Sequence, residues 1–210
     1  MTNPLTSLDE LIWKQFEKIT VAANKRLGWN KYDLAQIADT GNGISYAGIG
    51  VYGLIAGLSG ERYQWMLLSF AICLPFGVVY HKASQQKNKR KYDEEVNLLV
   101  RTGAARTPTM DPERPLQLAV GGFMFGLGIS ALSGYYPTFF SAQGNYLWGM
   151  LSALAGTGHL SMVSANYFRS QIMIPPSTKK SIWKALADYV TKPFHQAAPQ
   201  PVEVPAEIIK

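Results

Sequence analysis

Charged residues are absent from three long stretches of the chain. No Asp, Glu, Lys or Arg occurs at positions 40–60, 63–80 or 115–168, and the segments between them carry nearly all the charge. A helix needs about 20 residues to cross the apolar core of a bilayer, so the third stretch is long enough for two crossings and a turn. Because backbone groups in lipid must be hydrogen-bonded within the protein, helices are favoured. The pattern predicts an all-α membrane protein with four transmembrane helices arranged as two hairpins.

The charged segments divide this architecture into parts. We place the four spans at 43–60, 63–80, 116–136 and 146–168. The predicted organisation is, in order, amphipathic N-terminal helices at 1–42, transmembrane hairpin 1 at 43–81, a charged loop at 82–115, transmembrane hairpin 2 at 116–168, an amphipathic helix at 169–196 and a Pro-rich tail at 197–210. A soluble helical protein with buried hairpins is the alternative interpretation.

The distribution of cationic residues predicts the topology. Of the 20 Lys and Arg residues, five precede position 40, eight lie in the central charged segment and six follow position 168, whereas Arg62 alone lies on the other side. Cationic residues gather on the cytoplasmic side of membrane proteins. Both termini and the central loop are therefore expected on the cytoplasmic side, or the equivalent matrix or stromal side. Aromatic residues at 135–148 are expected to lie at the opposite interface.

The N-terminal segment has the apolar periodicity of an amphipathic helix. Ser7 and Glu10 form a capping-box pattern at its start, and apolar residues recur at helical spacing up to Ala23. Charged residues among the first 18 positions interrupt any apolar core of a cleavable signal peptide. A second short helix is expected to begin at Asn30 and to end at the "TGNG" sequence, 40–43. Apolar residues between 182 and 194 predict the C-terminal amphipathic helix, and the proline-containing tail is expected to be extended.

Two short sequences recur at equivalent places in the predicted hairpins. "LIAGLSG" at 54–60 resembles "GISALSG" at 128–134, and "YQWMLLS" at 63–69 resembles "YLWGMLS" at 146–152. The matches fall at the end of an outgoing helix and the start of a returning one. They indicate a parallel duplication of one hairpin, an arrangement found in several membrane folds.

Small residues repeat at four-residue spacing along the predicted spans. Such positions let helix backbones approach closely in a membrane. These faces are suited to internal packing, to a homo-oligomer or to docking in a larger complex. The helix-packing candidates are Gly53, Gly57, Gly122, Gly126, Ser130, Gly134, Gly149, Ala153 and Thr157.

His159 is expected near the middle of the last span. An ionisable side chain at that depth is a candidate functional residue. The neutral imidazole is suited to bonding a carbonyl or hydroxyl across a helix interface, to transferring a proton, or to ligating haem or the magnesium of a chlorophyll-type pigment. A bis-histidine haem requires a second ligand at the same depth, and His81 lies at the edge of its span. No cofactor is expected, and His159 is the one cofactor-binding candidate.

The remaining residue inventory argues against an enzyme. The single cysteine, Cys73, excludes an internal disulfide, and the chain contains no Walker, HExxH, GxSxG or dinucleotide-binding motif. The basic sequence "KNKRK" at 87–91 and the net charge of +6 are explained by topology and by attraction to anionic lipid headgroups, rather than by nucleic acid.

The pattern favours a non-catalytic multi-pass subunit that packs in, scaffolds or stabilises a larger membrane protein complex. Its expected partners are other membrane subunits and lipids. The alternatives are a small channel or transporter, which the repeat favours, and a cofactor- or pigment-binding subunit that uses His159.

Overall fold

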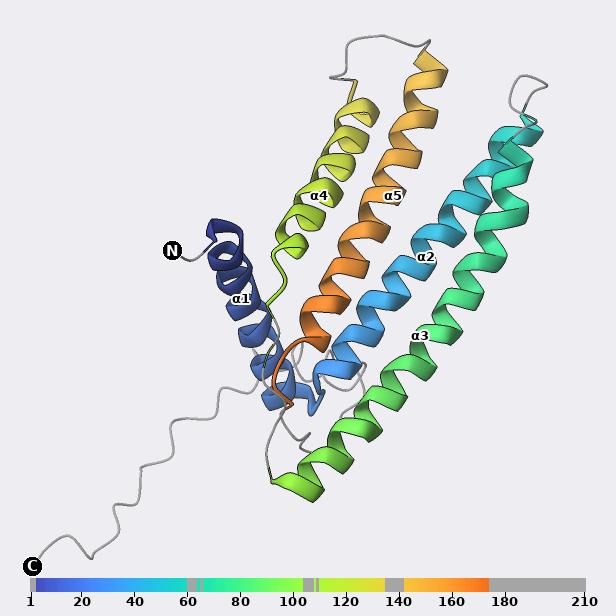
Figure 1. The fold of residues 1–210 in the computed structure, drawn as a ribbon. Coiled ribbons are helices and arrows are strands. Elements are labelled where there is room, and N and C mark those ends of the chain that lie inside the picture. The colour runs from blue at the N-terminus through green and yellow to red at the C-terminus, as the bar shows by residue number, and fades with distance from the viewer. Residues whose placement is uncertain are drawn as a thin grey trace, which may run out of the picture.

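The computed structural model of the chain describes residues 3–59, 64, 66–103, 108, 110–134 and 142–173, and the regular structure in these residues is entirely helical (Figure 1). The expectation of an all-α fold is therefore confirmed for this part of the chain. The elements are α1 (Pro4–Leu27), α2 (Lys31–Leu58), α3 (Leu67–Thr102), α4 (Glu113–Leu132) and α5 (Ala142–Arg169).

Helix α1 begins one turn earlier than its capping-box pattern predicts. The Asn3 side chain accepts a hydrogen bond from the Leu5 amide at 3.0 Å, and Pro4 occupies the first helical position, where a missing N–H costs nothing. Gly28 ends the helix at φ 69°, a left-handed conformation that glycine adopts without strain, and its N–H donates to the Asn24 carbonyl.

Helix α2 is continuous, and the expected break at 40–43 is wrong. The helix starts as predicted: the Asn30 side chain accepts from the Asp33 amide while the Asp33 carboxylate accepts from the Asn30 amide. Gly41 and Gly43 lie inside the helix, where a Cβ built at Gly43 would be 3.1 Å from the Gly77 carbonyl oxygen of α3. Close packing against neighbouring helices therefore outweighs the low intrinsic helix propensity of these glycines.

Helix α3 extends much further than its predicted span. It runs through Pro75 and continues through most of the segment expected to be a charged loop, ending at Gly103 with φ 65°. Ser84 and Asn88, which lie in that segment, are buried. The polar half of α3 is helical because it packs against the other helices at this end of the molecule, a tertiary effect that hydropathy does not report.

Four of the helices form an open row in the order α3, α2, α5, α4 (Figure 1). Extensive contacts join α2 to α3, α4 to α5 and α2 to α5, and α1 contacts α4 and α5 at one end. Within the described residues no comparable contact joins α3 to α4. Helix α3 therefore has α2 as its neighbour in the row, and α4 packs against α5 and, at one end, against α1; many apolar side chains on the other sides of α3 and α4 are exposed.

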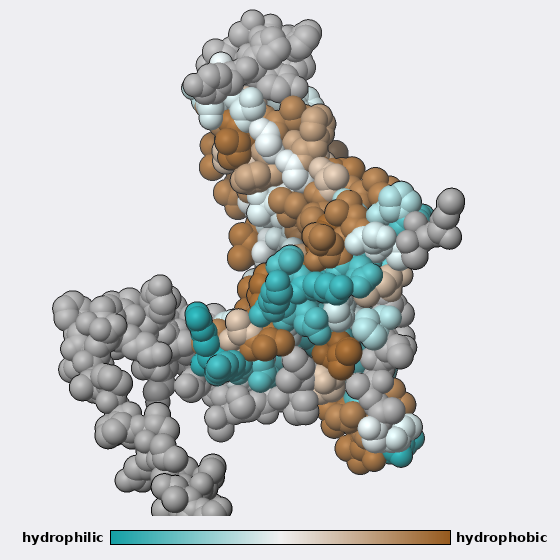
Figure 2. Space-filling view, turned by 90° about the vertical axis from the view of Figure 1, so that its left-hand side faces the viewer, coloured by the Kyte–Doolittle hydropathy of each residue, from teal (hydrophilic) through white to brown (hydrophobic). Residues whose placement is uncertain are grey.

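Helices α3 and α4 are long and apolar enough to cross a membrane, and little of either apolar segment is buried in the structure. Side chains such as Val79 and Phe123 are 63 % and 67 % exposed. Figure 2 shows hydrophobic residues over the upper part of the described surface and hydrophilic residues gathered below them. The inner helices α2 and α5 do not reach the same hydropathy, because they carry polar residues such as Asn42 and His159 where they face their neighbours.

Several predicted features lie outside the described residues. These are the aromatic segment at 135–141, the side chains at 142–145, both aromatic residues of the first turn (Tyr63 and Trp65), the amphipathic helix beyond residue 173, and the tail at 197–210.

Candidate functional site

The interface between α2 and α3 is built on glycines. A Cβ built at Gly53 would lie 2.7 Å from the Met66 carbonyl oxygen, and one built at Gly57 would lie 2.7 Å from Leu67 Cγ. Real Cβ atoms do not approach other atoms this closely. The structure thus places both of these helix-packing candidates against the start of α3.

The interface between α4 and α5 is equally close but uses a different set of glycines on α4. A Cβ at Gly128 would lie 2.7 Å from Ala153 Cα, and one at Gly149 would lie 3.1 Å from Leu132 Cγ. Gly121 and Gly156 also lie in this interface. The structure therefore places Gly149 and Ala153 between the two helices, together with glycines that the four-residue ladder missed. Gly121 and Gly128 are seven residues apart, and so are Gly149 and Gly156. Residues at this spacing lie on the same face of a helix, and this spacing is the signal that was missed.

The predicted ladder on α4 lies on a different face. Gly122 and Gly126 are exposed, and a Cβ built at either one would meet no atom within 4 Å. Ser130 is half-buried, and Gly134 lies past the end of the helix with φ 75°. On α5, Thr157 is exposed and its hydroxyl donates to the Ala153 carbonyl of the same helix at 2.8 Å. The side of α4 that points away from α5 is therefore a strip of small residues with no neighbour in the described chain.

Three buried ion pairs join the helices at the end where α1 lies. Asp39 pairs with Arg169, Lys31 with Glu95 at 2.8 Å, and Asp9 with Arg114 at 2.7 Å. At least one partner in each pair is almost inaccessible to solvent. This polar cluster was not predicted from the sequence, because its partners are 64 to 130 residues apart and no local spacing links them.

Asp39 is the centre of the cluster. Its carboxylate accepts hydrogen bonds from Asn88 at 2.9 Å, from Tyr80 at 3.3 Å and from Arg169. Arg169 also donates to Asn88 at 2.8 Å and to Asn166 at 3.0 Å. A buried carboxylate and guanidinium are tolerated only when each is satisfied in this way. The network ties α2, α3 and α5 together at one level.

His159 lines a separate cavity of about 220 Å³ between α2, α4 and α5. Asn42, Ser45 and Tyr46 contribute polar groups from α2, and Met124 closes it from α4. The His159 Nε2 atom is buried and has no hydrogen-bond partner among the described residues. The bond to a carbonyl or hydroxyl that was expected for the imidazole is thus not formed by Nε2 within the described residues, and the cavity holds the ring beside the polar side chains of α2.

The cavity is small for a flat cofactor. Pockets for drug-sized ligands measure about 300–1,000 Å³, and this one lies below that range. His81 is engaged elsewhere, since its Nδ1 lies 3.2 Å from Thr40 Oγ1 and its Nε2 lies 3.0 Å from Gln85 Nε2. The cavity beside His159 is thus smaller than haem or a chlorophyll-type pigment would need, and cofactor binding there stays a prediction.

Replacing His159 by leucine is expected to change the free energy of unfolding by less than about 1 kcal/mol, because the buried nitrogen makes no bond that would be lost. Thermal unfolding of the purified protein in mild detergent measures this. Leu154→Ala is the control within the same cavity and should cost about 2–5 kcal/mol. A loss of several kcal/mol in His159→Leu, or an absorption band that disappears with it, would instead assign His159 a bound ligand.

In the described part of the chain, no group of three or more His, Cys, Asp or Glu side chains is arranged to hold a metal ion. No protein-family model, curated protein or solved structure matches the chain. A functional argument therefore depends on the residues themselves.

Proposed function

We propose that this protein is a non-catalytic, four-span membrane subunit that uses the small-residue strip of α4 to dock against a helix of another membrane protein. The observation that carries the proposal is the open space at Gly122 and Gly126, on an apolar helix that is exposed on that side. Lipid chains gain little from a strip of small side chains, whereas a second helix can approach it closely enough for extensive van der Waals contact.

Four spans are supported by the dimensions of the row. Helices α2 and α5 each contain 28 residues, which corresponds to about 42 Å and exceeds the roughly 30 Å of a hydrocarbon core. They lie between the two more apolar helices and so need fewer apolar side chains of their own. The buried ion pairs lie at the end of the row where the cationic segments gather, which is consistent with a cytoplasmic location for that end.

The geometry of α4 supports docking on one defined face. Residues at 119, 122, 126, 130 and 133 fall on one side of a helix with 3.6 residues per turn, and all are small. Gly121 and Gly128, which pack against α5, fall on the opposite side. Phe123 stands beside the strip and is 67 % exposed, so it is available to pack against an incoming helix.

A small channel or transporter is the second candidate. The cavity beside His159 favours it, because polar groups of α2 and α5 meet there in the middle of apolar helices. The open row counts against it, since a pore formed by one chain requires helices that close around it, and in the described residues no contact comparable to those between the neighbouring helices joins α3 to α4. Solute flux into liposomes above that of protein-free controls would favour this alternative.

The docking proposal is tested with the double variant Gly122→Leu, Gly126→Leu, made in the full chain in its native host. Added bulk should hold the partner helix away and reduce the amount of the large complex by at least about tenfold. Native gel electrophoresis in mild detergent measures the complex. A photo-crosslinking residue at position 123 should label the same partner, and one at exposed Ala71 of α3 should not.

The control variant places leucine elsewhere, with Ala71→Leu and Thr157→Leu, at two small exposed residues outside the strip. This variant should retain the complex. A wild-type protein that runs as a clean monomer, or a strip variant that keeps its partner, contradicts the proposal. A crosslinked product of twice the chain's mass would identify a second copy as the occupant and would likewise exclude a different subunit.

A further inference from the structure

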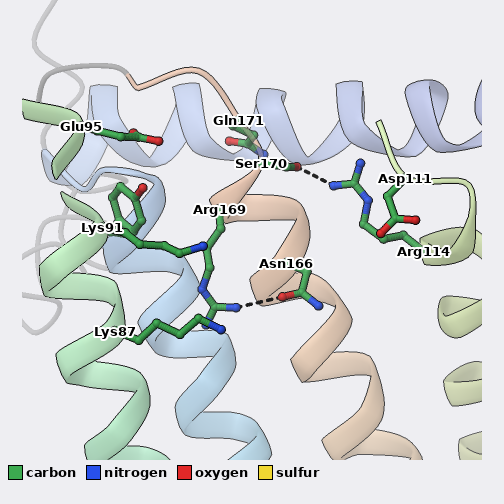
Figure 3. Close-up of a pocket in the computed structure, with 10 residues that line it drawn as sticks. Lys87, Lys91, Glu95, Asp111, Arg114, Asn166, Arg169, Ser170 and Gln171 are labelled. Atoms are coloured by element: carbon green, nitrogen blue, oxygen red, sulfur yellow. Dashed lines mark hydrogen bonds between the residues drawn. The ribbon is translucent and has the colours of Figure 1, made fainter. Parts of the chain in front are cut away.

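A second cavity, also of about 220 Å³, opens beside the buried ion pairs and is lined by the polar half of α3, the end of α5 and the start of α4 (Figure 3). It contains Lys87, Lys91, Arg114 and Arg169 but only two carboxylates, those of Glu95 and Asp111. The lining thus carries four cations and two anions. When the adjoining Lys31, Asp9 and Asp39 are added, five cations still face four anions.

The two carboxylates of the cavity already have partners. Glu95 is bonded to the Lys31 ammonium at 2.8–2.9 Å, and Asp111 accepts a hydrogen bond from the Glu113 amide at 3.0 Å. The other two acids of the cluster, Asp39 and Asp9, lie behind the cavity and are paired with Arg169 and Arg114. The lining of the cavity thus carries more positive than negative charge.

Figure 3 shows the Lys87 and Lys91 side chains extending from α3 toward Arg169 on α5. Like charges brought together in this way repel one another, whereas an anion bound between them would be attracted to each of the three cationic groups. Arg169 has donors to spare, because three of its five N–H groups are used by Asp39, Asn88 and Asn166. Asn166, Ser170 and Gln171 add further polar side chains to the same wall.

We propose that this cavity is a binding site for a phosphate group, with Lys87, Lys91 and Arg169 as its main ligands. Ammonium and guanidinium groups form their strongest hydrogen bonds with oxyanions such as phosphate. The volume has room for several water-sized groups, and the exposed Lys87 side chain leaves the cavity open to solvent. The phosphate is carried either by an anionic lipid headgroup or by a free phosphate compound, and the site does not depend on the docking face of α4.

The test uses the purified full chain in mild detergent. Binding is measured as the thermal shift produced by a titration with phosphatidylglycerol, with phosphatidylcholine as the zwitterionic reference, and by a separate titration with inorganic phosphate. The double variant Lys87→Gln, Lys91→Gln should raise the apparent Kd at least about tenfold, since it removes two charge-assisted hydrogen bonds. The matched control is Lys89→Gln, Arg90→Gln, which removes the same charge from exposed positions of the same helix outside the cavity and should change Kd less than about twofold.

Selective weakening of phosphatidylglycerol binding in the cavity variant alone supports the proposal and identifies a lipid source. The same selectivity with inorganic phosphate supports it and identifies a free phosphate source. Equal weakening in both double variants would show attraction to the basic helix as a whole and would overturn the proposal. Absence of any shift with either ligand, in a wild-type protein that unfolds cooperatively, would overturn it as well.

Discussion

Replacing Gly128 by alanine is expected to lower the free energy of unfolding by about 1–3 kcal/mol, although alanine is the better helix former. The added methyl group would lie 2.7 Å from both Cα and Cβ of Ala153, so the axes of α4 and α5 must separate. Most of the obstructing atoms belong to the α5 backbone, which cannot rotate away as a flexible side chain could. Thermal or denaturant unfolding in mild detergent measures the loss.

Gly122→Ala is the matched control on the same helix. No atom lies within 4 Å of the Cβ that it adds, so the higher helix propensity of alanine should leave stability unchanged or raise it by up to about 1 kcal/mol. Equal losses in the two variants would mean that the α4–α5 contact is not as close as the structure has it. The comparison therefore separates packing from helix propensity with a single methyl group.

Asp39→Asn is expected to cost about 3–5 kcal/mol, because it leaves the Arg169 guanidinium buried without its counter-charge. The substitution is nearly isosteric, so little of the loss comes from changed volume. Asp39 is completely buried and its two carboxylate oxygens accept hydrogen bonds from three different side chains, whereas asparagine keeps only one acceptor oxygen. Unfolding in mild detergent measures the effect, and Asp39→Asn combined with Arg169→Gln should lose less than the sum of the single variants.

An exposed ion pair supplies the control for this prediction. Glu10 and Lys14 are joined at 2.7 Å on the surface of α1, with side chains more than half exposed. Glu10→Gln should change stability by less than about 1 kcal/mol, because solvent screens the pair. If Asp39→Asn were equally mild, water would have to reach Arg169, and the buried network would not hold the helices together.

Helices were predictable where the pattern of apolar residues was continuous, and their ends were predictable only in part. The reciprocal bonds of Asn30 and Asp33 confirm the predicted start of α2. Its continuation through Gly41 and Gly43 was not predicted, because those glycines are stabilised by contacts with α3 and α5 that local propensity does not contain. The polar half of α3 was read as a loop for the same reason. Helices α3 and α4 are shown to be long and apolar enough to cross a membrane, and the four crossings themselves stay a prediction.

The candidate sites, like the helices, could be predicted from the sequence only in part. His159 could be identified from sequence because it is an isolated ionisable residue in an uncharged run, and the structure places it in a cavity. The cation-lined cavity could not be identified, since Lys87 and Arg169 come from helices that are neighbours only in the folded chain. The glycines that pack α4 against α5 could not be identified, because Gly121 and Gly122 are adjacent and four-residue spacing selects the second of them.

The position of Arg169 at the end of α5 has a consequence for biogenesis. Asp39 is synthesised 130 residues before Arg169, whose guanidinium neutralises the Asp39 carboxylate. The α2–α3 and α4–α5 hairpins join helices that follow one another in the chain, so each can pair soon after synthesis, whereas the charge at Asp39 is compensated only after the second hairpin has emerged and docked. A nascent chain stalled before residue 169 would thus retain an Asp39 carboxylate without its cationic partner.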